Sequence, residues 1–181
     1  RKAVNLSFAA TRLPSDQLNE DQSLRIAGAN LMVGSGATVA TEGGGSLSFS
    51  AGGNLTVAGT LAAPGGNITL TVEGTRGGSA SDPDKIGFLP TQALWLTDTA
   101  KIRAGGTVEY QNALNGLRIG QVYGGGTVTL NARRGYVIGE AGSTIDIGGY
   151  ETTLDLYGGR ASSLVSRDAG TLALTSPEGI L

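Results

Sequence analysis

The chain has 181 residues, of which 31 are glycine, 15% are charged and none is cysteine or histidine. Its formal net charge of −2 excludes a broad basic surface for nucleic acid or an anionic membrane. The missing residue types exclude disulfides, thiolate metal sites and nucleophile pairs that use histidine as the base.

Residues 1–22 are the least regular part of the sequence. Val4, Leu6 and Phe8 alternate with small or polar residues, as in a strand with one buried face. A turn at 12–16 and a polar linker follow. We therefore expect residues 1–22 to form a partial coil or a cap.

From Ser23 onward a four-residue pattern recurs, in which a small polar residue precedes an apolar, a variable and a second apolar residue. Period-two alternation places both apolar residues on one face of a strand. The pattern predicts a first type of strand. Its seven copies occupy 23–26, 46–49, 67–70, 107–110, 127–130, 153–156 and 171–174.

Two further strand types alternate with the first, and glycine pairs typically close the turn back to the next first strand. The second type is predicted at Leu31/Val33, Leu55/Val57, Leu94/Leu96, Leu117/Ile119 and Val137/Ile138. The third type is predicted at 38–40, 60–62, 101–103 and 144–146. Strands and turns that repeat every ~20 residues are typical of a parallel β-solenoid. We expect about seven stacked coils in one domain at 23–181.

One step between first strands, from Ile68 to Val108, spans 40 residues and interrupts the repeat. It contains Pro83 and Pro90 and no clean first strand. Proline disfavours a central strand, so we expect a protruding loop at about 74–93 rather than a degenerate coil.

Trp95 is the best candidate for a binding residue. It alternates with Leu94 and Leu96, so its side chain should point outward beside the predicted loop. An exposed aromatic residue next to a loop can stack on a sugar ring or on a partner protein. The candidate binding residues are Trp95, Phe88, Lys85 and Arg76. The alternative is that Ile86, Phe88 and Leu89 simply cover the indole.

No cluster of catalytic or metal-binding residues stands out. The outward positions of the predicted first strands place no two acids on neighbouring coils. In chain order these positions are Arg25, Ser48, Thr69, Glu109, Thr129, Asp155 and Ala173. Enzymes with this architecture need several carboxylates, or carboxylates with Arg or Lys, on adjacent coils. We therefore expect no catalytic residue, no metal site and no cofactor.

The segments 125–132, 141–149 and 52–61 resemble the passenger repeats of filamentous haemagglutinin-type exoproteins. The resemblance covers about 23–74 and 94–181. It implies a right-handed parallel β-helix in a fragment of a longer protein that is secreted or held at the bacterial cell surface. It also implies an outer-membrane transporter of two-partner secretion as a partner of the full-length protein.

These observations predict an adhesin-type stalk or display scaffold that is not an enzyme. Its partners would be host or bacterial surface glycans or proteins, without nucleic acid and without membrane insertion. The fragment itself is expected to be a monomer or to stack end to end. The alternatives are a carbohydrate-active, pectate-lyase-like β-helix enzyme and the stalk of an exoprotein for contact-dependent inhibition or signalling.

Overall fold

The computed structural model describes residues 3–11, 29–73, 75–76, 86–87, 91–112, 116–156 and 161–181. Within these ranges the protein is all-β and has no helix, and hence none that could cross a membrane. The strands form three parallel sheets and three antiparallel pairs. The all-β prediction is thereby confirmed.

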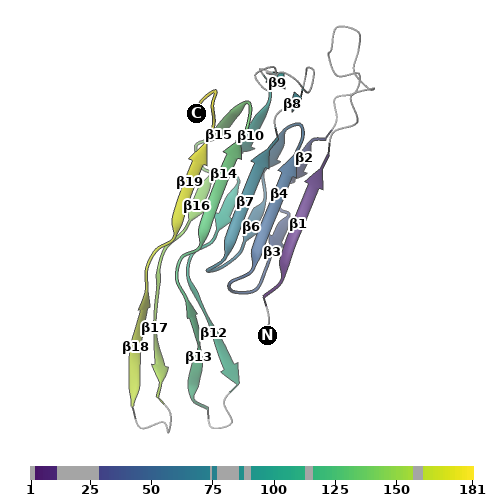
Figure 1. Cartoon of the computed structure of the whole chain (residues 1–181). Coiled ribbons are helices and arrows are strands. Elements are labelled where there is room, and N and C mark those ends of the chain that lie inside the picture. The colour runs from purple at the N-terminus through teal and green to yellow at the C-terminus, as the bar shows by residue number, and fades with distance from the viewer. Residues whose placement is uncertain are drawn as a thin grey trace.

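The chain visits the three parallel sheets in a fixed order, and each visit adds a strand beside the previous one (Figure 1). The first sheet contains β1 (Asn5–Ala10), β4 (Ser46–Ala51), β7 (Asn67–Val72), β14 (Thr127–Ala132) and β19 (Thr171–Thr175). The second contains β2 (Leu31–Val33), β5 (Leu55–Val57), β10 (Ala93–Leu96) and β15 (Tyr136–Gly139). The third contains β3 (Thr38–Ala40), β6 (Thr60–Ala62), β11 (Lys101–Arg103) and β16 (Thr144–Asp146).

Alternation along each strand separates the core from the surface. In β4, Leu47, Phe49 and Ala51 are buried, while the serines between them lie on the outward side. The register places Leu47 beside Ile68 of β7 and Ile68 beside Val128 of β14. A slip of one residue would turn every apolar side chain of a strand to solvent. The apolar pattern therefore specifies the register as well as the strand.

All three parallel sheets contribute to one buried cluster. Leu55 and Leu94 from the second sheet and Leu61 and Ile102 from the third are fully buried in it. Strands of three residues carry one or two inward side chains each, so no strand is stable alone. Their burial becomes favourable only when neighbouring strands stack.

A column of glycines lies where the chain enters the first sheet. Each member stands directly before one strand of the sheet. In the order β4, β7, β14 and β19 they are Gly45, Gly66, Gly126 and Gly170. A Cβ at Gly66, Gly126 or Gly170 would overlap the carbonyl oxygen of the previous member of the column. Glycine is therefore required here because adjacent backbones approach closely.

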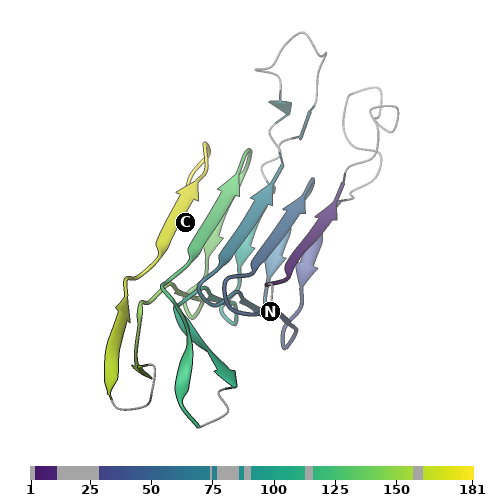
Figure 2. The same cartoon turned by 60° about the horizontal axis from the view of Figure 1, so that its bottom comes forward.

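Two antiparallel hairpins replace part of the predicted repeat. The first joins β12 (Thr107–Asn112) to β13 (Arg118–Tyr123), and the second joins β17 (Tyr150–Asp155) to β18 (Ser162–Arg167). Each is inserted between a strand of the third sheet and the next strand of the first sheet. Both hairpins extend side by side beyond the end of the first sheet at which β14 and β19 begin (Figures 1 and 2).

The hairpins correct three of the predicted strand assignments. The segments 107–110 and 153–156 were expected in the first sheet, but 107–110 begins β12 and 153–155 ends β17. Leu117/Ile119 was expected in the second sheet, but Ile119 lies in β13. The error has a physical cause, because alternating apolar residues suit a hairpin strand as well as a stacked strand. The predicted strand at 23–26 lies outside the described residues.

The segment 1–22 contributes β1, which pairs in parallel register with β4. Phe8 of β1 stacks on Phe49, with ring centroids 4.8 Å apart. In the segment 74–93, β8 (Thr75–Arg76) and β9 (Ile86–Gly87) form a short antiparallel pair. Residues 77–85 and 88–90 of that segment lie outside the described residues.

Candidate functional site

Trp95 lies on the outward face of β10, as its alternation with two leucines predicted. Its side chain is 41% exposed, and its ladder neighbours are Thr56 of β5 and Ile138 of β15. The indole Nε1–H donates a hydrogen bond of 2.9 Å to Oε1 of Glu140. The second carboxylate oxygen accepts the backbone N–H of Asp98 at 2.9 Å. Glu140 therefore holds the indole in one orientation.

The other three predicted binding residues are not brought to Trp95 by any described contact. Arg76 lies in β8, but its side chain is outside the described part of the structure. Lys85 and Phe88 lie outside the described residues. The predicted binding patch, and the alternative in which Phe88 helps to cover the indole, therefore remain predictions.

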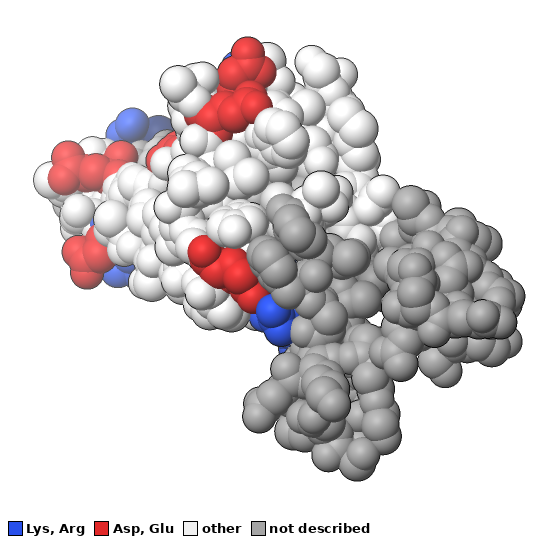
Figure 3. Space-filling view, turned by 90° about the horizontal axis from the view of Figure 1, so that it is seen from above, with Lys and Arg blue, Asp and Glu red and all other residues white. Residues whose placement is uncertain are grey.

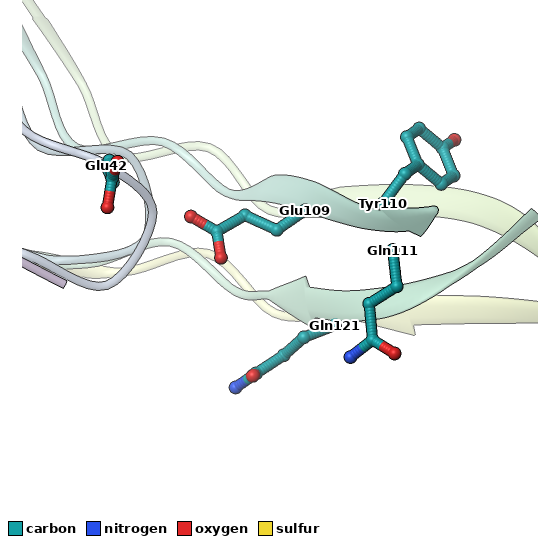
Figure 4. A pocket seen from close by; sticks show the side chains of 5 residues that line it. All are labelled: Glu42, Glu109, Tyr110, Gln111 and Gln121. Carbon is teal, nitrogen blue, oxygen red and sulfur yellow. The ribbon is translucent and has the colours of Figure 1, made fainter. Parts of the chain in front are cut away.

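A hollow of about 360 Å³ lies between the turn before β4 and the first projecting hairpin. We call it the hairpin hollow, and its lining residues are Glu42, Glu109, Tyr110, Gln111 and Gln121. Figure 4 shows Glu109 pointing toward the turn that carries Glu42, with Gln111 and Gln121 on the same side of the hairpin. The ring of Tyr110 points to the opposite side.

The strand alternation of the hairpin explains which side chains meet in the hollow. Glu109 and Gln111 are two residues apart on β12, so they share a face. Gln121 lies directly opposite Glu109 on β13. The two glutamines are exposed, whereas the two glutamates are half-buried. The hollow is therefore lined by carboxylates and amides that reach it from two separate elements.

Glu109 fastens the hairpin to the turn. Its Oε1 accepts the backbone N–H of Gly43 at 3.0 Å, and its Oε2 accepts the hydroxyl of Tyr123 at 3.4 Å. The Tyr123 ring lies so close to Gly44 that a Cβ there would stand 2.8 Å from it. Burial of the phenol, followed by the charge and hydrogen bond of Glu109, raises the pKa of Tyr123.

The second hairpin packs against the face of the first that points away from the hollow. Arg118 donates its backbone N–H to Oδ2 of Asp155 at 2.7 Å, and its guanidinium lies 3.5 Å from Oδ1. The hydroxyls of Tyr110 and Thr152 are 3.1 Å apart. The backbone hydrogen bond from Arg118 is the main cause that lowers the pKa of Asp155. These contacts support the first hairpin from behind.

The described part of the chain contains no group of three or more acids that could hold a metal ion. Figure 3 shows acidic side chains in several small, separate patches on one face, with uncharged surface between them. The hairpin hollow offers hydrogen-bond donors and acceptors from its carboxylates and amides. Such groups can pair with a polar ligand.

The sequence carried a signal for the hairpins that the repeat interpretation overlooked. Asn115-Gly116 stands between two alternating runs, and Gly158-Gly159 stands between the next two. Such dipeptides between alternating strands are the strongest short-range indication of a hairpin. The meeting of Glu42 with Glu109 had no such signal, because the two residues are 67 positions apart.

Comparison of the chain with protein-family models, with curated proteins and with solved structures finds no match.

Proposed function

We propose that this chain is a segment of a secreted bacterial surface exoprotein of the filamentous haemagglutinin type, and that it acts as a display scaffold. In this proposal the three parallel sheets form a right-handed parallel β-helix that serves as a stalk. The two projecting hairpins, with the Trp95 surface as a further candidate, carry recognition. The full-length protein would reach the cell surface through an outer-membrane transporter of two-partner secretion.

The position of the two hairpins is the observation that carries this proposal. They are inserted at the same connection of successive coils, and they leave the parallel ladders of all three sheets uninterrupted. The buried cluster is built from the three sheets and includes none of the described residues of either hairpin. Elements that contribute little to the core and project side by side are suited to contact with another molecule.

The outward face of the first sheet favours adhesion over the pectate-lyase-like alternative. The outward positions of the first sheet are small and uncharged on adjacent strands, for example Ser48, Thr69 and Thr129. A pectate-lyase-like site would need acids and bases at such positions. A stalk for contact-dependent inhibition or signalling would share the scaffold, and no observation favours it over adhesion.

Binding of the protein to a panel of glycans and of host and bacterial cells tests the proposal. One variant replaces residues 107–124 and 150–168 with short turns like the one at 63–66, which connects the same two sheets without a hairpin. A second variant replaces 74–92 with a Gly-Ser turn. Circular dichroism and denaturant unfolding confirm that each variant is folded.

We expect the intact protein to bind and the variant without hairpins to lose binding. Loss of binding in the 74–92 variant alone would contradict the role of the hairpins and move recognition to the Trp95 surface. An absence of binding by all three folded proteins would contradict a recognition role for this segment and leave it as a spacer.

A further inference from the structure

We propose that the hairpin hollow binds a neutral or amine-bearing sugar unit of a surface polysaccharide. This inference rests on the proposed display function and specifies its ligand class. It depends on three features of the hollow: its size, the mixture of carboxylates and amides that line it, and the contacts that hold Glu109 in place.

The size of the hollow limits the ligand to a small unit. A volume of about 360 Å³ is near the lower end of the range of roughly 300–1,000 Å³ that small-molecule sites occupy. The hollow lies open between the turn and the hairpin, so a unit within a longer chain can enter it (Figure 4). One sugar ring, with its neighbours extending outward, matches this space.

The lining side chains match hydroxyl groups in particular. Each carboxylate oxygen can accept more than one hydrogen bond, and each glutamine can both donate and accept. A sugar hydroxyl also donates and accepts, so adjacent hydroxyls can pair with a carboxylate and an amide at once. Gln121 lies directly opposite Glu109, which places the two groups together on one face of the hairpin.

Glu109 is held in place before any ligand arrives. Its two oxygens accept hydrogen bonds from Gly43 and Tyr123, which come from different elements. A fixed side chain loses less conformational entropy on binding than a free one. Those two hydrogen bonds use part of the carboxylate, and its remaining lone pairs can still accept a hydrogen bond from a sugar hydroxyl or amino group.

The charge of the hollow determines which sugars enter. Among the described residues, those that carry charge in its lining are Glu42 and Glu109, so uronic acids and other anionic sugars would be repelled. An amino group, by contrast, would be attracted by both carboxylates. A lysine side chain shares that attraction, but its ammonium group only donates and leaves the amide N–H groups of Gln111 and Gln121 without an acceptor. The amides therefore favour a sugar ring, whose hydroxyls both donate and accept, over a lysine side chain.

Isothermal titration of the intact protein tests this inference. The probes are chitin oligosaccharides, which are neutral, chitosan oligosaccharides, which carry amines, hyaluronan oligosaccharides, which are anionic, and a lysine-rich peptide. We expect the first two to bind and the last two not to bind. Gln121→Ala should weaken saccharide binding by about tenfold, because a hydrogen bond to a polar ligand is lost.

Two further variants make the test specific. Asn67→Ala removes an exposed amide from β7, on the outward face of the first sheet, and should leave binding unchanged. Glu42→Gln keeps a hydrogen-bonding group but removes a charge, so it should weaken the chitosan probe more than the chitin probe. Unfolding curves of all variants show whether the fold is retained.

Several results would overturn the inference. These are binding of the hyaluronan or peptide probe in preference to the sugars, equal binding by intact protein and Gln121→Ala, and no saccharide binding at all. If saccharides fail while hairpin removal still abolishes cell binding, the inference falls and the display function stands. If hairpin removal also has no effect on cell binding, both fall.

Discussion

At the scale of single residues, the glycine column is where we expect a substitution to be tolerated least. Thr127 N–H donates to the carbonyl oxygen of Gly66, and Thr171 N–H donates to that of Gly126. These are the same oxygens that an added Cβ at Gly126 or Gly170 would overlap. The hydrogen bond that starts each new strand therefore requires a residue without a side chain just before that strand.

The substitution Gly126→Ala should strongly destabilise the protein. The new methyl group would push the Gly66 carbonyl away and break the hydrogen bond from Thr127, at a cost of about 3 kcal/mol in the free energy of unfolding. Denaturant unfolding followed by circular dichroism measures this cost. The matched control is Gly34→Ala, because a Cβ at Gly34 meets nothing within 4 Å. Similar losses in the two variants would show that steric overlap in the column is not the cause.

Tyr123 should make stability depend on alkaline pH. Its pKa is raised in the folded protein by burial and by Glu109, so the folded state holds the phenol proton more tightly than the unfolded state. This contribution to stability is complete below the ordinary tyrosine pKa and is lost as pH rises through the raised value. Unfolding free energies should therefore fall more steeply at alkaline pH in the intact protein than in Tyr123→Phe. Parallel pH profiles for the two proteins would refute this coupling.

The sequence pattern could predict the glycine turns, but not which distant residues form hydrogen bonds near them. The glycines at 43–45, 65–66, 105–106 and 148–149 were expected to close turns into first-sheet strands. The first two groups do so, whereas the other two lead into the hairpin strands β12 and β17. Gln92, the one buried polar residue in the described part, donates to the Glu73 carbonyl oxygen at 2.7 Å. No periodicity marked it, because it lies just outside a strand, and its partners depend on how distant segments meet.

At the scale of elements, the strands of the third sheet were predicted at their observed bounds, whereas two segments predicted for the first sheet, 107–110 and 153–156, lie in the hairpins. Short stacked strands with one apolar position between glycine corners have few other arrangements. The runs at 107–112 and 150–155 could pair with the next coil or with their own following run. Local pairing through a short turn closes a smaller loop, and the Asn-Gly and Gly-Gly dipeptides favour it.

At the scale of the whole molecule, the β19 end of the stack is an exposed edge. Leu172 and Leu174 are each 41% exposed, although their ladder partners Val128 and Leu130 are almost fully buried. Within the described ranges β14 is the only strand that pairs with β19, so the other edge of β19 presents open backbone groups. Exposed edges with apolar side chains tend to pair with further strands.

We therefore expect this 181-residue chain to associate as its concentration rises, and Leu172→Lys to reduce that association. A lysine at the edge adds charge where another apolar strand would pack, which is a common protection of edge strands. Static light scattering over a concentration series measures the mean mass. Thr69→Lys serves as the control, because it adds the same charge to the outward face of β7, which has neighbours on both sides. A constant monomer mass for the intact chain, or an equal effect of both lysines, would show that the β19 edge does not drive association.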